Sequence, residues 1–268
     1  MNSLGTSTLK NFQTYLKLKN YADRTIQTYS WALSVFLHNV GKSAIHLSSN
    51  DFNNFLSTYS FTSPQQQNQF ISALKLFREK IQHKKFNRID FDRPRREKIL
   101  PKIVDSNLIL DSIEKIKNIK HKAIISLAYS VGLRVSEVIN LKISDIDSKR
   151  MIIHINQAKG KKDRIVPLSP NILEILRQYY KEFKPKTFLF NGQNSLQYSS
   201  GSCNAIVKKY LGKDFHFHLL RHSCFTHLIE NGTDCRIIQK LAGHSSVKTT
   251  EIYMQVSTKT LKTIKLPI

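Results

Sequence analysis

The sequence contains no apolar stretch close to the about 20 residues that a helix needs to span a lipid bilayer. Residues 1–5 do not open a signal peptide, because no basic segment followed by an apolar run is found there. These two absences argue against a membrane-spanning or secreted protein. We therefore expect a protein that works in the cytoplasm.

Cysteine is also scarce. The three cysteines, Cys203, Cys224 and Cys235, are odd in number and show no C-x-x-C spacing. This pattern argues against a disulfide framework and against a zinc site built from cysteines, and it is typical of a reducing compartment.

Acidic residues are few, with 19 Asp and Glu against 42 Lys and Arg, so the formal net charge is +23 and the pI about 10.0. Such a surface attracts polyanions. Nucleic acid is the commonest polyanionic partner, and contacts with its phosphates would dominate the affinity. A basic protein without such a partner is the alternative that composition alone leaves open.

Residues 1–92 show apolar side chains at helical spacing over most of their length, most clearly at 9–16, 26–37 and 70–81. Four helices with short connections form a compact bundle. A hydrophobic content of 40% is enough for an ordinary core. We therefore predict a first domain over residues 1–92, in which the aromatic residues fill the core and do not stack on nucleic acid.

Residues 93–101 break the helical spacing and are mostly polar and basic, with Pro94 and Pro101 near the two ends. This composition predicts a linker between two domains. Both a solvated connection and a segment that lies against a phosphate backbone are compatible with it.

Residues 102–268 form the second predicted domain. Two segments rich in β-branched residues, 151–155 and 164–168, flank a turn at 159–163 and predict an antiparallel pair of strands. Most of the remainder shows helical spacing, including an amphipathic helix over 171–183. The predicted fold class is mainly α with a small antiparallel β-sheet.

Arg134 follows Gly132 at the predicted start of a helix, with Glu137 one turn further on. A helix N-terminus favours anions, and an arginine there adds a bidentate fork. A surface Arg–Glu pair on a helix is the more common explanation of such a sequence.

His218 and Arg221 lie three residues apart on a predicted helix and share one face, and His222 can lie on that face too. Two histidines at helical spacing can ligate zinc. The glutamate of the H-E-x-x-H pattern is absent, because Leu219 stands in its place. A metal site is therefore the weaker interpretation of these histidines.

Three further residues have side chains suited to proton transfer or nucleophilic attack. Lys159 lies at the tip of the predicted hairpin and could protonate a leaving oxygen, although Lys161 and Lys162 offer the same chemistry. His244 lies at a predicted turn between helices, and Tyr253 follows on or near the next helix. A phenol with a pKa of about 10 needs activation, or neutralisation of the phosphate, to be a nucleophile at neutral pH. Taken singly, each of the three has a structural explanation.

The joint order of these residues resembles the tyrosine recombinase (phage integrase) family. The series is Arg134…Lys159…His218-x-x-Arg221…His244…Tyr253. The stretch 218–253 is similar to the Xer and phage-integrase type, and residues 1–92 are similar to the family's SAM-like core-binding domain. The sequence departs from the family pattern at Ala242 and at Met254-Gln255, and neither departure removes a catalytic group.

The resemblance implies how the phosphate would be held. Arg134 and Arg221 would clamp the scissile phosphate and stabilise its transition state, and His244 would hydrogen-bond the same phosphate. Glu137 matches a supporting acidic position that orients the site.

The resemblance also implies the bond-making groups. Tyr253 would be the nucleophile and would form a 3′-phosphotyrosyl link. His218 would assist proton transfer with the nucleophile, and Lys159 would be the general acid for the leaving 5′ oxygen. No metal or other cofactor is required, because basic side chains supply the charge stabilisation.

At the level of the assembly, the resemblance implies a two-domain clamp on double-stranded DNA. The protein would be a monomer or dimer when free and a tetramer on two recombining sites, acting on the nucleoid in the cytoplasm of a bacterial type of cell. An accessory DNA-bending or regulatory protein fits this scheme, and a mobile genetic element is the favoured setting. A DNA-relaxing enzyme of the type IB topoisomerase kind, a non-catalytic DNA-binding regulator and a metal-dependent nuclease are the alternatives.

Overall fold

The computed structural model describes residues 3–85, 93–94, 101–158, 162–193, 195–244 and 246–256. The chain divides into two compact units, Met1–Lys98 and Ile99–Ile268. The division falls within the predicted linker 93–101. No helix in the described part of the chain has both the length and the apolar character needed to cross a membrane.

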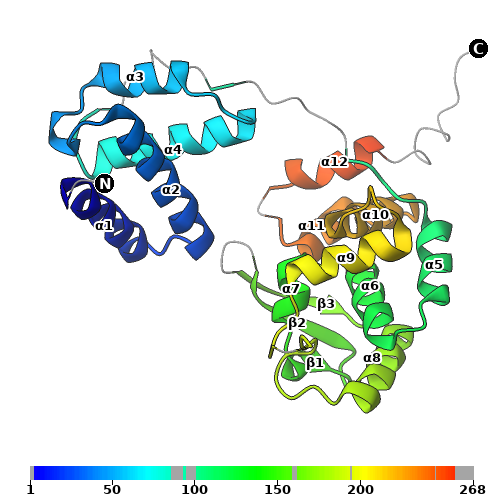
Figure 1. Ribbon diagram of the computed structural model, residues 1–268. Coiled ribbons are helices and arrows are strands. Elements are labelled where there is room, and N and C mark those ends of the chain that lie inside the picture. Colours follow the sequence, from blue (N-terminus) through cyan, green and yellow to red (C-terminus); the bar gives the residue numbers. More distant parts are fainter. Residues whose placement is uncertain are drawn as a thin grey trace, which may run out of the picture. The chain divides into compact units, whose positions relative to one another are not determined.

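The described part of the first unit is a bundle of four α-helices (Figure 1). Its elements are α1 (Ser3–Leu18), α2 (Asp23–Val40), the short 3-10 helix η1 (Ala44–His46), α3 (Ser49–Thr58) and α4 (Pro64–Lys80). Helix α3 begins with a capping box between Ser48 and Asp51, and α4 begins with Pro64 after an N-cap from Ser63.

Aromatic side chains fill the core of this bundle. Phe36, Phe52, Phe70 and Phe77 are at most 1% exposed. The Phe36 and Phe52 rings pack with centroids 4.6 Å apart. The prediction that these aromatics form the core is confirmed. Arg93 of the predicted linker donates hydrogen bonds to Asn68 and Ser72 on α4.

The second unit is mainly helical and contains a small sheet (Figure 1). Its elements are α5 (Ser106–Lys115), α6 (Ile119–Val131), α7 (Val135–Asn140), η3 (Ile143–Asp145), β1 (Ile146–Asp147), β2 (Ile152–Ala158), β3 (Lys162–Pro167), α8 (Pro170–Phe183), α9 (Ser200–Leu211), α10 (Phe217–Glu230), α11 (Cys235–Ala242) and α12 (Lys248–Val256). The mainly α fold class with a small antiparallel sheet is confirmed.

The sheet has three antiparallel strands in the order β1-β2-β3. Ile153 pairs with Ile146 on one side and with Val166 on the other, and the β2–β3 register shifts between Ile155 and Ala158. The two predicted strands are present as β2 and β3, and the short β1 adds an edge that the sequence pattern did not indicate.

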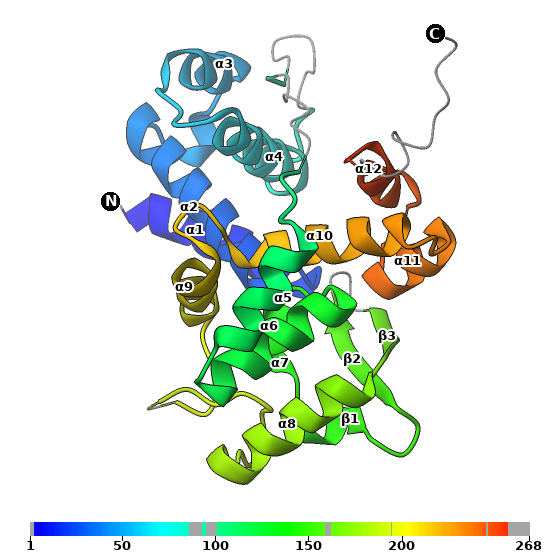
Figure 2. The same ribbon diagram turned by 90° about the vertical axis from the view of Figure 1, so that its right-hand side faces the viewer.

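Helix α6 lies at the centre of the second unit, with α10 on one side and α8 on the other (Figure 2). Because every side chain of α6 from Ala123 to Ala128 is buried, the helix is packed on all sides. Helices α10, α11 and α12 pack around a separate cluster that contains Cys224, Phe225 and Tyr253. These packed elements carry most of the predicted site.

Candidate active site

The turn between α6 and α7 places Arg134. Helix α6 ends at Gly132, whose φ of +64° is left-handed. A Cβ at this position would lie 2.5 Å from Cζ of Phe225 on α10, so both the backbone and the packing require glycine. The chain then enters α7 with Arg134 at the N-cap. The backbone N–H of Arg134 donates to Oε2 of Glu137 at 2.8 Å, and its Nη1 donates to Oε1 at 2.7 Å. The pair is buried, because the Glu137 side chain is only 4% exposed.

Glu137 is shared by two arginines. Arg164 on β3 donates Nη1 to Oε1 at 2.8 Å and Nη2 to Oε2 at 2.9 Å. Burial would raise the pKa of Glu137, but the hydrogen bonds and charges of Arg164 and Arg134 hold that pKa at about 2. The carboxylate therefore stays ionised and binds both guanidinium groups. Arg164 was not singled out by sequence.

Arg221 on α10 is a buried cation that is only 1% exposed. Its Nη1 donates to the carbonyl of Gly132 and its Nη2 to the carbonyl of Ala242, each at 2.6 Å. Its guanidinium carbon lies 4.7 Å from the centre of the Phe225 ring. No ion pair with a carboxylate is found for Arg221 among the described residues. Burial and the charge of Arg134 lower its pKa to about 10, so the group remains protonated at neutral pH.

His218 and His222 lie on α10 with their ring centroids 4.5 Å apart. His222 is half-buried, whereas His218 is more exposed at the cavity wall. Desolvation, reinforced by neighbouring positive charge, lowers the pKa of each histidine to about 4. Both rings are therefore neutral at pH 7 and can accept a proton. The buried Nδ1 of His222 has no hydrogen-bond partner among the described residues.

His244 follows Gly243, the left-handed residue that ends α11. Its Nε2 lies 3.2 Å from Nη2 of Arg221, and its Nδ1 lies 2.9 Å from Oγ1 of Thr250. Because a guanidinium can only donate, Nε2 must accept in this arrangement. The Nδ1 proton of a neutral imidazole then points to Thr250, a fully buried residue that sequence reasoning missed.

Tyr253 on α12 is 3% exposed and packs against histidines on two elements. Its ring centroid lies 5.6 Å from that of His222 and 6.3 Å from that of His244. Burial raises the pKa of Tyr253, while the charge of Arg221 and a side-chain hydrogen bond with it act in the opposite direction. The phenol is therefore protonated at rest and lies beside both a base and a cation.

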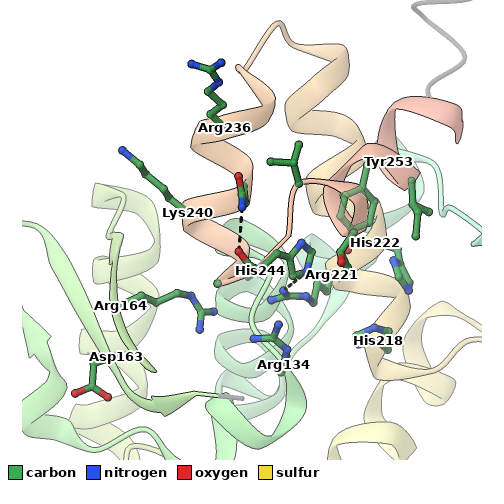
Figure 3. Close-up of a pocket in the computed structure, with 15 residues that line it drawn as sticks. Arg134, Asp163, Arg164, His218, Arg221, His222, Arg236, Lys240, His244 and Tyr253 are labelled. Atoms are coloured by element: carbon green, nitrogen blue, oxygen red, sulfur yellow. Dashed lines mark hydrogen bonds between the residues drawn. The ribbon is translucent and has the colours of Figure 1, made fainter. Parts of the chain in front are cut away.

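One cavity of about 1030 Å³ is lined by Arg134, Arg164, His218, Arg221, His222, His244 and Tyr253 (Figure 3). Arg134, Arg221, His244 and Tyr253 converge in it, and Arg236 and Lys240 of α11 stand at its outer edge. The structure thus brings together all the predicted catalytic residues that it describes, while Lys159 lies outside the described residues.

The charged residues of the cavity lining are basic apart from Asp163. They are Arg134, Arg164, Arg221, Arg236 and Lys240. Arg236 and Lys240 lie four residues apart on one helix face, a spacing from which the sequence could have suggested them. The cavity is therefore suited to an anion.

Among the described residues, no group of three or more His, Cys, Asp or Glu side chains is placed to hold a metal ion. His218 and His222 are adjacent, but their nearest charged neighbours include Arg221, a cation that would oppose a metal ion. The donor set suits a phosphate better than a metal.

Two family models match the chain. The model described as "Phage integrase family" matches residues 104–260, and the model described as "Phage integrase, N-terminal SAM-like domain" matches residues 8–88. Together they cover most of both units.

Two curated relatives match over nearly the whole chain. A tyrosine recombinase XerA from Pyrococcus horikoshii is 34% identical over 268 residues, covering 95% of this chain and 90% of the relative. A putative integrase/recombinase, y4qK, from Sinorhizobium fredii is 32% identical over 253 residues, covering 91% and 82%.

Solved structures agree with these relatives. The crystal structure of XerA recombinase matches with a TM-score of 0.57 at 28% identity, covering 96% of both chains. A lambda integrase dimer bound to a core site matches with a TM-score of 0.71 at 18% identity, covering 92% of this chain and 94% of that one, which shows a shared fold. The chain belongs to the phage integrase family. The enzyme class expected from the sequence, a tyrosine-type site-specific recombinase, is confirmed.

Proposed function

We propose that this chain cuts and rejoins double-stranded DNA through a covalent link between Tyr253 and a 3′ phosphate. The phenolic oxygen attacks the scissile phosphorus, so that a bond to tyrosine forms and the bond to the 5′ oxygen breaks. The phenolic proton passes to a base, and the departing oxygen takes up a proton. In rejoining, a 5′ hydroxyl attacks the phosphotyrosine. Because one phosphodiester replaces another at each step, no energy-rich cofactor is consumed.

The observation that carries this proposal is the buried charge of Arg221 beside Tyr253. A buried cation is costly unless it is paired. Here two backbone carbonyls and the His244 imidazole contact Arg221, while a carboxylate partner is missing among the described residues. A phosphate bound in the cavity would supply the missing anion. Arg134 lines the same cavity and would add a second donor to that phosphate.

Proton transfer falls to the neutral histidines of α10. In this proposal His218, which is more open to the cavity, assists removal of the phenolic proton as Tyr253 attacks. Its lowered pKa keeps the imidazole unprotonated at neutral pH, which leaves one ring nitrogen open to receive the phenolic proton. Lys159 would protonate the leaving 5′ oxygen, a role that follows from the family resemblance.

His244 would contact the same phosphate from the α11–α12 turn. In the structure its Nε2 accepts from Arg221, so donation to a phosphate oxygen requires a proton on Nε2. The Thr250 hydroxyl can donate to Nδ1 as well as accept from it, so it supports either tautomer. Binding of the anion would favour the form of His244 that donates.

Substitution of Tyr253 by phenylalanine tests the proposal, with Tyr180→Phe on α8 as the matched control. In a suicide duplex, the short fragment that carries the new 5′ hydroxyl dissociates after cleavage, so the covalent product cannot be rejoined. The amount of this product is then measured on a denaturing gel. Tyr253→Phe should bind DNA with the wild-type Kd and give no covalent product. Tyr180 is exposed and lies outside the cavity, so its variant should react at the wild-type rate. A covalent product from Tyr253→Phe would contradict the assignment.

We further infer the organisation and assembly from the family. The two domains would comprise residues 1–92 and 102–268, and the basic segment 93–101 would join them. The net charge of +23 supports a DNA partner. Four protomers would act on two DNA sites, together with an accessory DNA-bending or regulatory protein. The reaction would take place on the nucleoid, in the cytoplasm.

A further inference from the structure

Arg164 links three elements of the second unit. It lies on β3, and its guanidinium group reaches α7 through both oxygens of Glu137. Its Nε donates to the carbonyl of Leu241 on α11 at 2.7 Å. The side chain is only 8% exposed. A buried arginine that makes three directed hydrogen bonds to two other elements fixes their relative position.

The contact with Glu137 determines how Arg134 is presented. Arg164 engages both oxygens of the carboxylate, while Arg134 reaches only Oε1 with its Nη1. No hydrogen bond of Arg134 Nη2 or Nε to another described residue is found. These two nitrogens therefore keep their capacity to donate to a phosphate. Without Arg164, Glu137 could rotate and take both nitrogens of the Arg134 fork, the geometry that an isolated Arg–carboxylate pair prefers.

The contact with Leu241 determines where His244 lies. The last carbonyls of α11 are each bound by an arginine, Leu241 by Arg164 and Ala242 by Arg221. The next residue, Gly243, lies close to the Arg164 side chain, because a Cβ added at Gly243 would be 3.2 Å from Cδ of Arg164. The end of α11 is therefore held from two sides, immediately before His244.

We propose that Arg164 is a positioning residue for the cleavage reaction, which keeps the Arg134 fork open and the α11 end in place for the scissile phosphate. This inference rests on the proposed function. Three N–H groups of Arg164 donate to protein groups, and in this proposal the residue acts through Arg134 and His244. Lysine cannot replace it, because an ammonium group lacks the fixed fork that binds two carboxylate oxygens and a carbonyl together.

The test compares Arg164→Lys with the wild type at saturating suicide DNA, with Arg177→Lys on the exposed face of α8 as the matched control. Arg164→Lys should keep the Kd for DNA within about threefold. Its single-turnover rate should fall about 100-fold, the loss expected when catalytic groups shift by about 1 Å. Arg177→Lys should leave the rate unchanged.

A second substrate separates positioning from general loss of structure. In DNA with a methylphosphonate at the scissile position, the reacting group has no negative charge, so the Arg134 clamp contributes less. The rate ratio between wild type and Arg164→Lys should therefore shrink from about 100-fold to below about tenfold. A variant that is merely misfolded would lose the same factor on both substrates.

If Arg164→Lys fails to fold, Glu137→Gln provides a second test. It weakens the same contact between Arg164 and Glu137 from the carboxylate, so its rate loss should also be smaller on the methylphosphonate substrate. Equal losses on the two substrates by whichever variant folds, or an Arg164→Lys rate within threefold of wild type, would overturn the proposal. Failure of the wild type to form any covalent product would instead reject the proposed function.

Discussion

Gly132→Ala is expected to destabilise the second unit for two separable reasons. First, the φ of Gly132 is +64°, and an L residue in this region costs about 1–2 kcal/mol. Second, the added Cβ would lie 2.5 Å from the ring of Phe225, which is 0% exposed and has no room to move away. Overpacking of this kind costs about 1–3 kcal/mol. The free energy of unfolding should therefore fall by about 2–5 kcal/mol.

Gly232→Ala provides the matched control in the same unit. Its φ is +83°, yet a Cβ there would meet nothing within 4 Å. It should therefore carry only the backbone cost of about 1–2 kcal/mol. The difference between the two variants isolates the packing cost, which for a unit of this size corresponds to a Tm lower by about 2–12 °C.

Thermal unfolding followed by far-UV circular dichroism measures both variants. The carbonyl of Gly132 also accepts from Nη1 of Arg221, so displacement of the turn should slow covalent attachment to DNA as well. Gly232→Ala should leave that rate near the wild-type value. A Gly132→Ala protein that unfolds at or above the temperature of Gly232→Ala would refute the packing argument.

Two further predictions concern pH and the end of the chain. Burial, together with His218 and Arg221, lowers the pKa of His222 to about 4 in the folded protein. In the unfolded chain the pKa of a histidine is about 6.5, so between about pH 6.5 and pH 4 the unfolded state binds a proton at this residue and the folded state does not. The free energy of unfolding should therefore decrease as the pH falls through this window, and His222→Gln, but not the exposed His46→Gln, should flatten the decrease seen in urea titrations. An identical pH profile for His222→Gln and wild type would contradict the lowered pKa. Removal of the residues after Thr258, which lie outside the described residues, should weaken synapsis of two DNA sites more than binding to one site in gel-retardation assays; an unchanged synapsis yield would count against a docking role for this segment.

Much of the fold was predictable because it depends on local periodicity. The helical bundle of residues 1–92, the β2–β3 pair and the amphipathic α8 each follow from the spacing of apolar and β-branched residues. Strand β1 was missed because two residues carry too little pattern, and only pairing with β2 defines it.

The linear order of Arg134, His218, Arg221, His244 and Tyr253 was enough to predict the class of enzyme, because their types and order resemble one family. The sequence could not show that Arg221 is buried, nor which groups solvate it. Those groups are backbone carbonyls of Gly132 and Ala242, which any residue type could supply. The departure at Ala242 is harmless to this contact for the same reason.

Arg164 is the clearest example of a residue whose role could not be predicted from the sequence. In the linear chain it follows a basic turn and could be one more solvated cation. Its partners Glu137 and Leu241 are 27 and 77 residues away, so no local pattern connects them. By itself, the sequence determined the class of enzyme, because the types and order of a few side chains resemble one family. The tertiary structure alone decided which charges are buried and shared, because burial and pairing arise only when distant elements pack.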